Sequence, residues 1–270
     1  MADAIQLNYE ITTAKESTAD TIVLIHGLFG DLDNLKSISR ALQSAYHVVN
    51  IDLRNHGESP WCETMTFMEM AADIEALLDK LEISKAHILG HSLGGKVAME
   101  FALEHPDRVH SLIIADIAPV AYEPSHNSIL DALEALDISA IKSRQEADKA
   151  LADAISEKGV RQFLLKNLYK ENNKWQWRMN IEGLRNCYED LIGEPAQQGQ
   201  FDAPVLFIRG GDSDYIQAEH RDAILNSFPQ AESKTINGTG HWLHAEKPVV
   251  FNGLVERFLE ENFGSESTNS

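Results

Sequence analysis

The spacing of hydrophobic positions predicts alternating strands and helices over the first part of the chain. Residues 5–12 alternate between apolar and polar side chains, which suits a strand at a sheet edge. Apolar runs that suit buried strands occupy residues 21–25, 46–52, 86–89 and 109–115. Helical spacing occupies residues 33–44, 66–81 and 96–102. A second set of strand, helix, strand and helix is expected at residues 204–209, 220–228, 232–236 and 249–262.

This order indicates an α/β fold with a mostly parallel central sheet, because the strands are apolar on both faces and helices separate them. Residues 119–200 break the rhythm with helical spacing and no strong strand run. We therefore expect an all-helical cap over the carboxyl edge of the sheet, where open α/β sheets bind ligands. The expected division is a core at 1–118 and 201–264, a cap at 119–200 and a flexible tail at 265–270.

The segment Gly90-His91-Ser92-Leu93-Gly94 joins a predicted strand to a predicted helix. It has the form Gly-x-Ser-x-Gly, the nucleophile elbow, whose sharp turn exposes the serine Oγ above the sheet. Glycines are needed on both sides because Cβ atoms there would clash with the neighbouring strand and helix. Ser92 is therefore the candidate nucleophile, and the side chain of His91 is expected to point away from the site.

A nucleophilic serine requires a base and an oxyanion hole. His241 is the candidate base, because it lies in a glycine-rich loop after the last predicted strand, within reach of the sheet edge. The backbone N–H groups of Leu93 and Leu28 are the expected oxyanion hole, with Phe29 as the second choice for the position of Leu28.

Two strand ends can supply the acid that orients the base. Asp116 ends one apolar strand. In the loop after the strand at 204–209, the usual acid position holds Ser213, which cannot carry a charge. Asp212 and Asp214 flank that serine, so a small shift of the loop could bring either one into place. Asp116 is the first candidate, and Asp214 and Asp212 remain alternatives.

Composition restricts the partners and the compartment. The 270 residues have a formal net charge of −19, which disfavours nucleic acids and anionic membranes. Two cysteines, Cys62 and Cys187, indicate free thiols in a reducing cytoplasm. We expect no signal peptide, membrane span, metal or cofactor, and either a monomer or a homodimer.

The chain resembles the α/β-hydrolase superfamily and, within it, small bacterial YbfF-type esterases. The resemblance rests on His-Gly-Leu-Phe-Gly at 26–30, Asp-Leu-Arg-Asn-His-Gly-Glu-Ser at 52–59, the elbow at 90–95, Asp-Ile-Ala-Pro-Val at 116–120 and Gly-x-Gly-His at 238–241. It implies a hydrolase of small acyl esters, with Asp116 as the acid and Ser213 near the histidine. Asp212 and Asp214 depart from the pattern and leave the acid open.

The expected activity is that of a serine carboxylesterase, which hydrolyses small to medium acyl esters through an acyl-enzyme. A thioesterase or C–C bond hydrolase would use the same groups, and a non-catalytic ligand receptor could share the fold. Arg54 is expected to support the oxyanion loop through hydrogen bonds, and the alternative is contact with a substrate carboxylate. Tyr122, Trp175 and Trp177 are candidates either to line the acyl site or to pack the cap, and packing is the expectation for Trp177.

Overall fold

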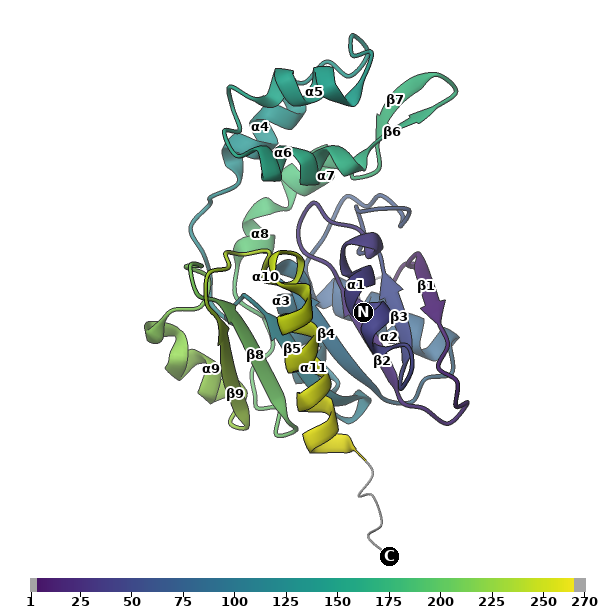
Figure 1. The fold of residues 1–270 in the computed structure, drawn as a ribbon, viewed down its shortest axis with the longest axis vertical. Helices are drawn as coiled ribbons and strands as arrows, with labels where there is room; N and C mark the ends of the chain where they lie inside the picture. The colour runs from purple at the N-terminus through teal and green to yellow at the C-terminus, as the bar shows by residue number, and fades with distance from the viewer. Residues whose placement is uncertain (1–3, 265–270) are drawn as a thin grey trace, which may run out of the picture.

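A twisted seven-stranded sheet forms the centre of the computed structural model, which describes residues 4–264 (Figure 1). In spatial order the strands are β1 (Tyr9–Thr12), β3 (His47–Ile51), β2 (Thr21–Ile25), β4 (Ala86–His91), β5 (Val109–Ala115), β8 (Val205–Gly210) and β9 (Ala231–Ile236). Only β1 pairs antiparallel, and the other neighbours are parallel. The predicted α/β class and mostly parallel sheet are confirmed. The predicted tail at 265–270 lies outside the described residues.

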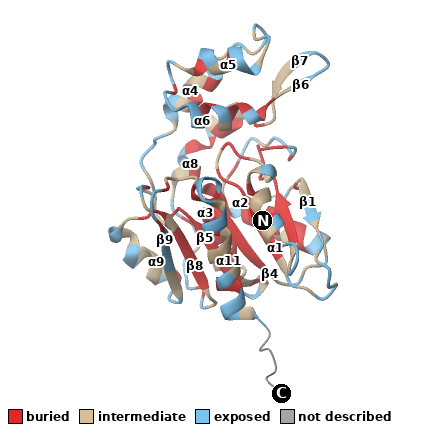
Figure 2. Ribbon diagram, in the orientation of Figure 1, coloured by how far each residue is buried: buried red, intermediate tan, exposed pale blue. Residues whose placement is uncertain are grey.

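Helices cover both faces of the sheet because alternate strand residues point to opposite sides. In β2, Val23 and Ile25 face one hydrophobic core, whereas Ile22 and Leu24 face the other. The first core is covered by α2 (Phe67–Lys80), α3 (Leu93–Glu104) and α9 (Arg221–Ser227). The second is covered by α1 (Lys36–Leu42) and α11 (Pro248–Phe263). The central strands β2, β3, β4, β5 and β8 are accordingly buried along nearly their whole length (Figure 2).

Short helical segments complete the connections. The α-helix α10 (Leu243–Glu246) directly precedes α11. The 3₁₀ turns are Leu32–Leu35, Pro106–Arg108, Leu165–Asn167 and Ala218–His220.

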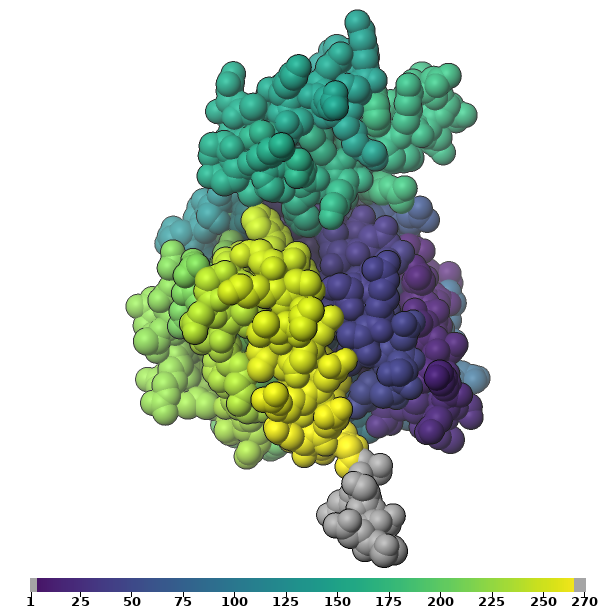
Figure 3. Space-filling model, in the orientation of Figure 1, coloured from purple at the N-terminus to yellow at the C-terminus, as the bar shows by residue number. Residues whose placement is uncertain are grey.

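Between β5 and β8 the chain leaves the sheet and builds a separate layer over one end of it (Figures 1 and 3). Its helices are α4 (Asn127–Ala135), α5 (Arg144–Leu151), α6 (Lys158–Leu164), α7 (Ile181–Asn186) and α8 (Tyr188–Ile192). We refer to this inserted layer as the cap. Its position follows from the direction of the strands, because β4, β5 and β8 all end on the side that the cap covers.

The expectation of an all-helical cap is wrong at one point. Strands β6 (Leu168–Glu171) and β7 (Lys174–Trp177) form an antiparallel hairpin. Its two turn residues, Asn172 and Asn173, have φ angles of 47° and 62°. A type I′ turn requires positive φ at both central residues, and asparagine adopts it readily. The Asn-Asn pair beside the alternating Lys-Trp-Gln-Trp was therefore the signal for this hairpin.

The first strand is also shorter than predicted. It begins at Tyr9 instead of residue 5. The preceding segment uses its backbone elsewhere: the N–H of Ile5 donates to Asp73 Oδ1 at 2.8 Å, and the N–H of Asn8 donates to Ser59 Oγ at 2.8 Å. These contacts to side chains take the place of the ladder bonds that the N–H groups of Ile5 and Asn8 would make in a strand.

Candidate active site

Ser92 lies in the tight turn between β4 and α3, with a φ angle of 53°. Left-handed backbone is unfavourable for residues with a side chain, so the surrounding structure must impose it. Its two flanking glycines show how close the packing is. A Cβ atom on Gly90 would lie 2.1 Å from the carbonyl oxygen of Gly94, and one on Gly94 would lie 2.3 Å from that of Ile25. The turn therefore depends on glycine at both positions.

The structure brings Ser92, His241 and Asp116 into one hydrogen-bonded chain. His241 Nδ1 lies 2.8 Å from Asp116 Oδ2, and His241 Nε2 lies 2.9 Å from Ser92 Oγ. Because a carboxylate only accepts, Nδ1 carries the proton and Nε2 is free to accept the hydroxyl proton of Ser92. This arrangement can activate a serine for attack on a carbonyl carbon.

Asp116 is fully buried, and among the described residues its side chain bonds to Gly210, Ser213 and His241. The N–H of Gly210 donates to Oδ1 at 2.9 Å, and the hydroxyl of Ser213 donates to Oδ2, the oxygen that faces His241. Asp212 and Asp214 are exposed, and Asp214 Oδ1 accepts from Gln217 Nε2 at 3.0 Å. The geometry therefore places neither alternative aspartate against His241.

The expected oxyanion hole consists of the N–H of Leu93 and a second N–H from Leu28 or Phe29. Leu93 opens α3, where the first N–H groups have no acceptor within the helix. The N–H of Phe29 donates to His56 Nε2 at 3.1 Å, whereas that of Leu28 has no acceptor among the described residues. Leu28 is thus better placed than Phe29 to donate a hydrogen bond to an oxyanion.

Two histidines, His26 and His56, connect the oxyanion loop to the segment at 52–59. His56 Nδ1 donates to the carbonyl of Arg54 at 3.0 Å, while its Nε2 accepts from Phe29. A second bond runs from the segment at 52–59 back to the oxyanion loop, where His26 Nε2 accepts the N–H of Leu53 at 3.1 Å. Burial lowers the pKa of His56 to about 3, which keeps its Nε2 a hydrogen-bond acceptor.

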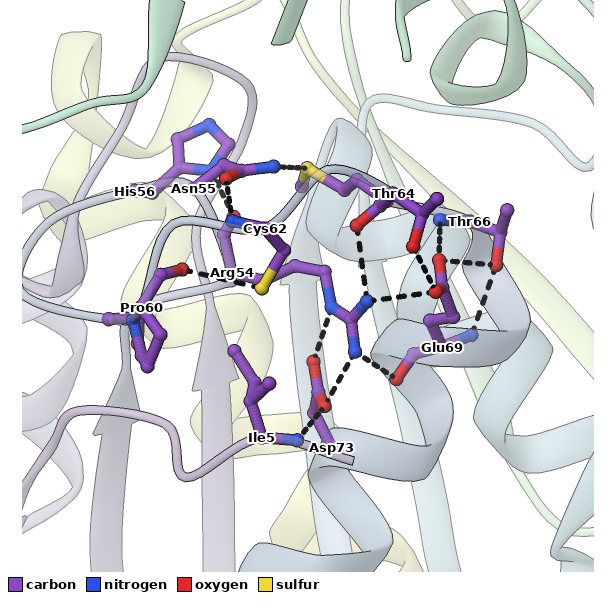
Figure 4. Close-up of polar contacts among 12 residues, drawn as sticks. Ile5, Arg54, Asn55, His56, Pro60, Cys62, Thr64, Thr66, Glu69 and Asp73 are labelled. Carbon is purple, nitrogen blue, oxygen red and sulfur yellow. Dashed lines mark hydrogen bonds and ion pairs between the residues drawn. The ribbon is translucent and has the colours of Figure 1, made fainter. Parts of the chain in front are cut away.

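The backbone carbonyl of Arg54 is linked to the oxyanion loop through His56, but its side chain does not support that loop as predicted. It is buried, and its guanidinium forms a two-pronged ion pair with Asp73 at 2.8 and 2.9 Å, with Glu69 at 3.2 Å (Figure 4). Asp73 in turn accepts the N–H of Ile5. Arg54 therefore joins its loop to α2 and to the N-terminal segment, because a buried cation requires carboxylates and α2 presents two of them.

Two further side chains hold His241 in place. The ring of Tyr215 stacks on its imidazole with the ring centroids 4.0 Å apart. His91 Nε2 donates to the backbone carbonyl of His241 at 2.8 Å. The prediction that His91 points away from the site is wrong, since the strained turn aims it at the loop that carries His241. Burial lowers the pKa of His91 well below its usual range, so it is a neutral support.

A cavity of about 240 Å³ opens above Ser92 and His241. Its remaining wall is mainly apolar and comes from the oxyanion loop, α4, α6 and Trp242. Tyr122 lines a second, smaller cavity beside Ser92, whereas Trp175 and Trp177 line neither. Both tryptophans pack against the hydrophobic core that includes the cap.

Within residues 4–264, no group of three His, Cys, Asp or Glu side chains is arranged to hold a metal ion.

Comparison with known proteins places this geometry in a family. A family model described as the alpha/beta hydrolase fold matches residues 20–138. The chain is 39% identical to esterase YbfF of Escherichia coli over 95% of its length and 100% of that protein. It is 37% identical to the mouse sn-1-specific diacylglycerol lipase ABHD11, over 90% of this chain and 82% of that protein.

Solved structures agree with the sequence relatives. A marine microorganism esterase superimposes with a TM-score of 0.91 at 35% identity, covering 95% of this chain and 100% of the other. The chain belongs to the α/β-hydrolase family. These three relatives are named as esterases or a lipase, and the chain is accordingly a hydrolase. None of its described helices has the length and apolar character needed to cross a membrane.

Proposed function

We propose that the protein is a serine carboxylesterase that hydrolyses small to medium acyl esters. The observation that carries this proposal is the hydrogen-bonded chain from Ser92 through His241 to Asp116 beneath an apolar cavity. Esterase YbfF and the marine esterase, which match nearly all of this chain, support the same chemistry. The cap at 119–200 would then shape the substrate site, and the core at 1–118 and 201–264 would supply the reacting groups.

The first half of the reaction forms an acyl-enzyme. His241 Nε2 takes the hydroxyl proton as Ser92 Oγ attacks the ester carbonyl carbon. The carbonyl oxygen becomes an oxyanion, which the N–H groups of Leu28 and Leu93 stabilise. Asp116 stabilises the imidazolium that forms. When the tetrahedral intermediate collapses, His241 returns the proton to the leaving oxygen and the alcohol departs.

Water then repeats the same steps on the acyl-enzyme. His241 accepts a proton from the water as its oxygen attacks the acyl carbon, and Ser92 leaves with a proton from His241. The carboxylic acid is released and the starting state is restored. Apart from water, these steps use only side chains and backbone groups of this chain.

The proposed compartment is the cytoplasm. Cys62 and Cys187 are both free thiols in the structure, which suits a reducing environment. The formal charge of −19 supports a small-molecule substrate in preference to a nucleic acid.

The test is turnover of p-nitrophenyl acetate and butyrate by the wild-type protein and by Ser92→Ala. We expect the substitution to remove turnover almost completely while the thermal unfolding curve stays cooperative, because only the nucleophile is lost. A fluorophosphonate should also attach to the wild type, with release of fluoride, at the peptide that contains Ser92. Activity near the wild-type value in Ser92→Ala, or labelling at another residue, would contradict the proposal.

A further inference from the structure

Two cavities meet over Ser92. The larger cavity, of about 240 Å³, is bounded by Phe29, Ile129, Val160, Phe163, Leu164 and Trp242. The smaller cavity, of about 40 Å³, is bounded by Leu93, Lys96, Ile117, Tyr122, Leu191 and Ile192. Both are also lined by Leu28, Ser92, His126 and Tyr215. A substrate bound at Ser92 can therefore place one part in each cavity.

The position of His241 distinguishes the two cavities. His241 lines the larger cavity but not the smaller one, whereas Leu93 lines only the smaller one. During collapse of the tetrahedral intermediate, His241 Nε2 must donate its proton to the oxygen of the leaving alcohol. The alcohol part of the ester therefore has to lie on the side of His241, which is the larger cavity.

The other substituents of the reacting carbon are then accounted for. One is Ser92 Oγ, one is the leaving oxygen near His241, and one is the oxyanion, directed at the N–H groups of Leu28 and Leu93. The remaining substituent is the acyl chain, and the space left for it is the smaller cavity. Resting on the proposed esterase activity, we propose that the enzyme selects esters of short acyl chains, of two to four carbons, with bulky apolar alcohols.

The size of the smaller cavity supports this limit. A cavity needs roughly 10–15 Å³ of such volume to hold one water molecule. About 40 Å³ therefore accepts roughly three groups of that size, which corresponds to an acetyl to butyryl chain. The larger cavity has room for a ring or a branched chain, and its wall is mostly apolar.

Hydrogen bonds hold the wall of the smaller cavity in place. The hydroxyl of Tyr122 donates to the carbonyl of Tyr215 at 2.5 Å and accepts the N–H of Ala118 at 2.9 Å. The N–H of Tyr122 and the ammonium of Lys96 both donate to the carbonyl of Ile192, each at 2.9 Å. A longer acyl chain would have to break these contacts between the core and the cap, because packed interiors yield little.

Two series of substrates test the proposal with the wild-type protein. In the first, p-nitrophenol is kept constant and the acyl chain is lengthened from acetate to decanoate. We expect kcat/KM to be highest between acetate and butyrate and to fall at least about tenfold by octanoate. In the second, acetate is kept constant and the alcohol is enlarged from ethanol to hexanol and 2-phenylethanol. There we expect kcat/KM to rise by up to about fourfold per buried methylene.

Paired substitutions assign each series to its cavity. Leu191→Ala, or the milder Leu191→Val, enlarges the smaller cavity and should move the acyl optimum to longer chains without changing the order of the alcohols. Val160→Phe narrows the larger cavity and should lower kcat/KM for the bulky alcohols without changing the acyl optimum.

The outcomes separate this proposal from the esterase proposal. A wild-type optimum at octanoate or longer, or a shift of the acyl optimum in Val160→Phe, would overturn the cavity assignment and leave the esterase proposal standing. Absence of turnover on every ester, or turnover that survives Ser92→Ala, would instead overturn the esterase proposal itself.

Discussion

At the scale of single residues, the candidate site depends on two side chains held on left-handed backbone. Ser92 and Asp116 have φ angles of 53° and 55°. Each ends a central parallel strand, and the positive φ turns the chain sharply, which leaves the side chain at the sheet edge. The N–H of Ser92 donates to the carbonyl of Ala115 at 3.0 Å, and that of Asp116 donates to the carbonyl of Ile208 at 2.9 Å. The neighbouring strands thus hold both turns in place.

The identity of the acid is tested by two matched substitutions. Asp116→Asn should lower kcat by about 10⁴-fold, because the neutral amide no longer stabilises the imidazolium of His241 and favours the wrong tautomer. Asp214→Asn should leave kcat within a factor of about two, because that carboxylate is exposed and contacts Gln217. Steady-state kinetics on p-nitrophenyl acetate measure both, and the reverse ranking would move the acid to the later loop.

At the scale of elements, the oxyanion loop is held by its neighbours. His26 and His56 connect it to the segment at 52–59, and from the cap Asn167 Nδ2 donates to the carbonyl of Phe29 at 2.7 Å. The cap and core are also joined where the N–H of Asn180 donates to the carbonyl of Asn55 at 2.9 Å. The loop that carries Leu28 is therefore restrained from both layers.

Removal of one of these contacts should lower activity without loss of the fold. His56→Phe keeps most of the side-chain volume but leaves the N–H of Phe29 and the carbonyl of Arg54 without their partner. We expect kcat to fall about tenfold, less than the loss of an oxyanion donor itself, and KM to change little. The control is His105→Phe at the far end of α3, for which kcat should stay within about twofold. Unchanged kcat in His56→Phe would show that the loop is restrained by other contacts.

At the scale of the whole molecule, buried neutral histidines make the fold sensitive to acid. Burial lowers the pKa of His56 to about 3 and those of His87, His126 and His244 to about 4. In the unfolded chain these groups take up protons near pH 6.5, so below that pH the unfolded state binds more protons than the folded state. Their contribution to stability is therefore complete above about pH 7 and is lost as the pH falls from 6.5 towards 4.

The free energy of unfolding should follow this pattern. Urea titrations should give a value that is nearly constant above pH 7 and falls steadily between pH 6.5 and pH 4. His87 alone should account for about 3 kcal/mol of the fall, from its lowered pKa. His87→Leu, remote from Ser92, should reduce the slope by about that amount. If the free energy of unfolding fell equally with pH in wild type and variant, His87 would have the same pKa in the folded and unfolded states, which contradicts the prediction.

Much of this architecture could be predicted because it depends on local chemistry. Runs of apolar residues identified the central strands, and the Gly-x-Ser-x-Gly segment identified the turn at Ser92, since both are determined by neighbours in the chain. The hairpin in the cap was not predicted, because its strands have four residues each and a partly exposed pattern, so that only its two asparagines marked it. Short strands depend on the turn more than on apolar periodicity.

The sequence by itself determined the fold class, the elbow around Ser92 and the candidate residues. Only the tertiary structure decided which aspartate faces His241, because Asp116 and the loop at 212–214 come from different strand ends that the sheet brings together. Ser213, not its acidic neighbours, points inward there and donates to Asp116. Likewise, Arg54 is directed to Asp73 and not to the oxyanion loop. Such choices depend on the direction of side chains across the fold, which local spacing does not encode.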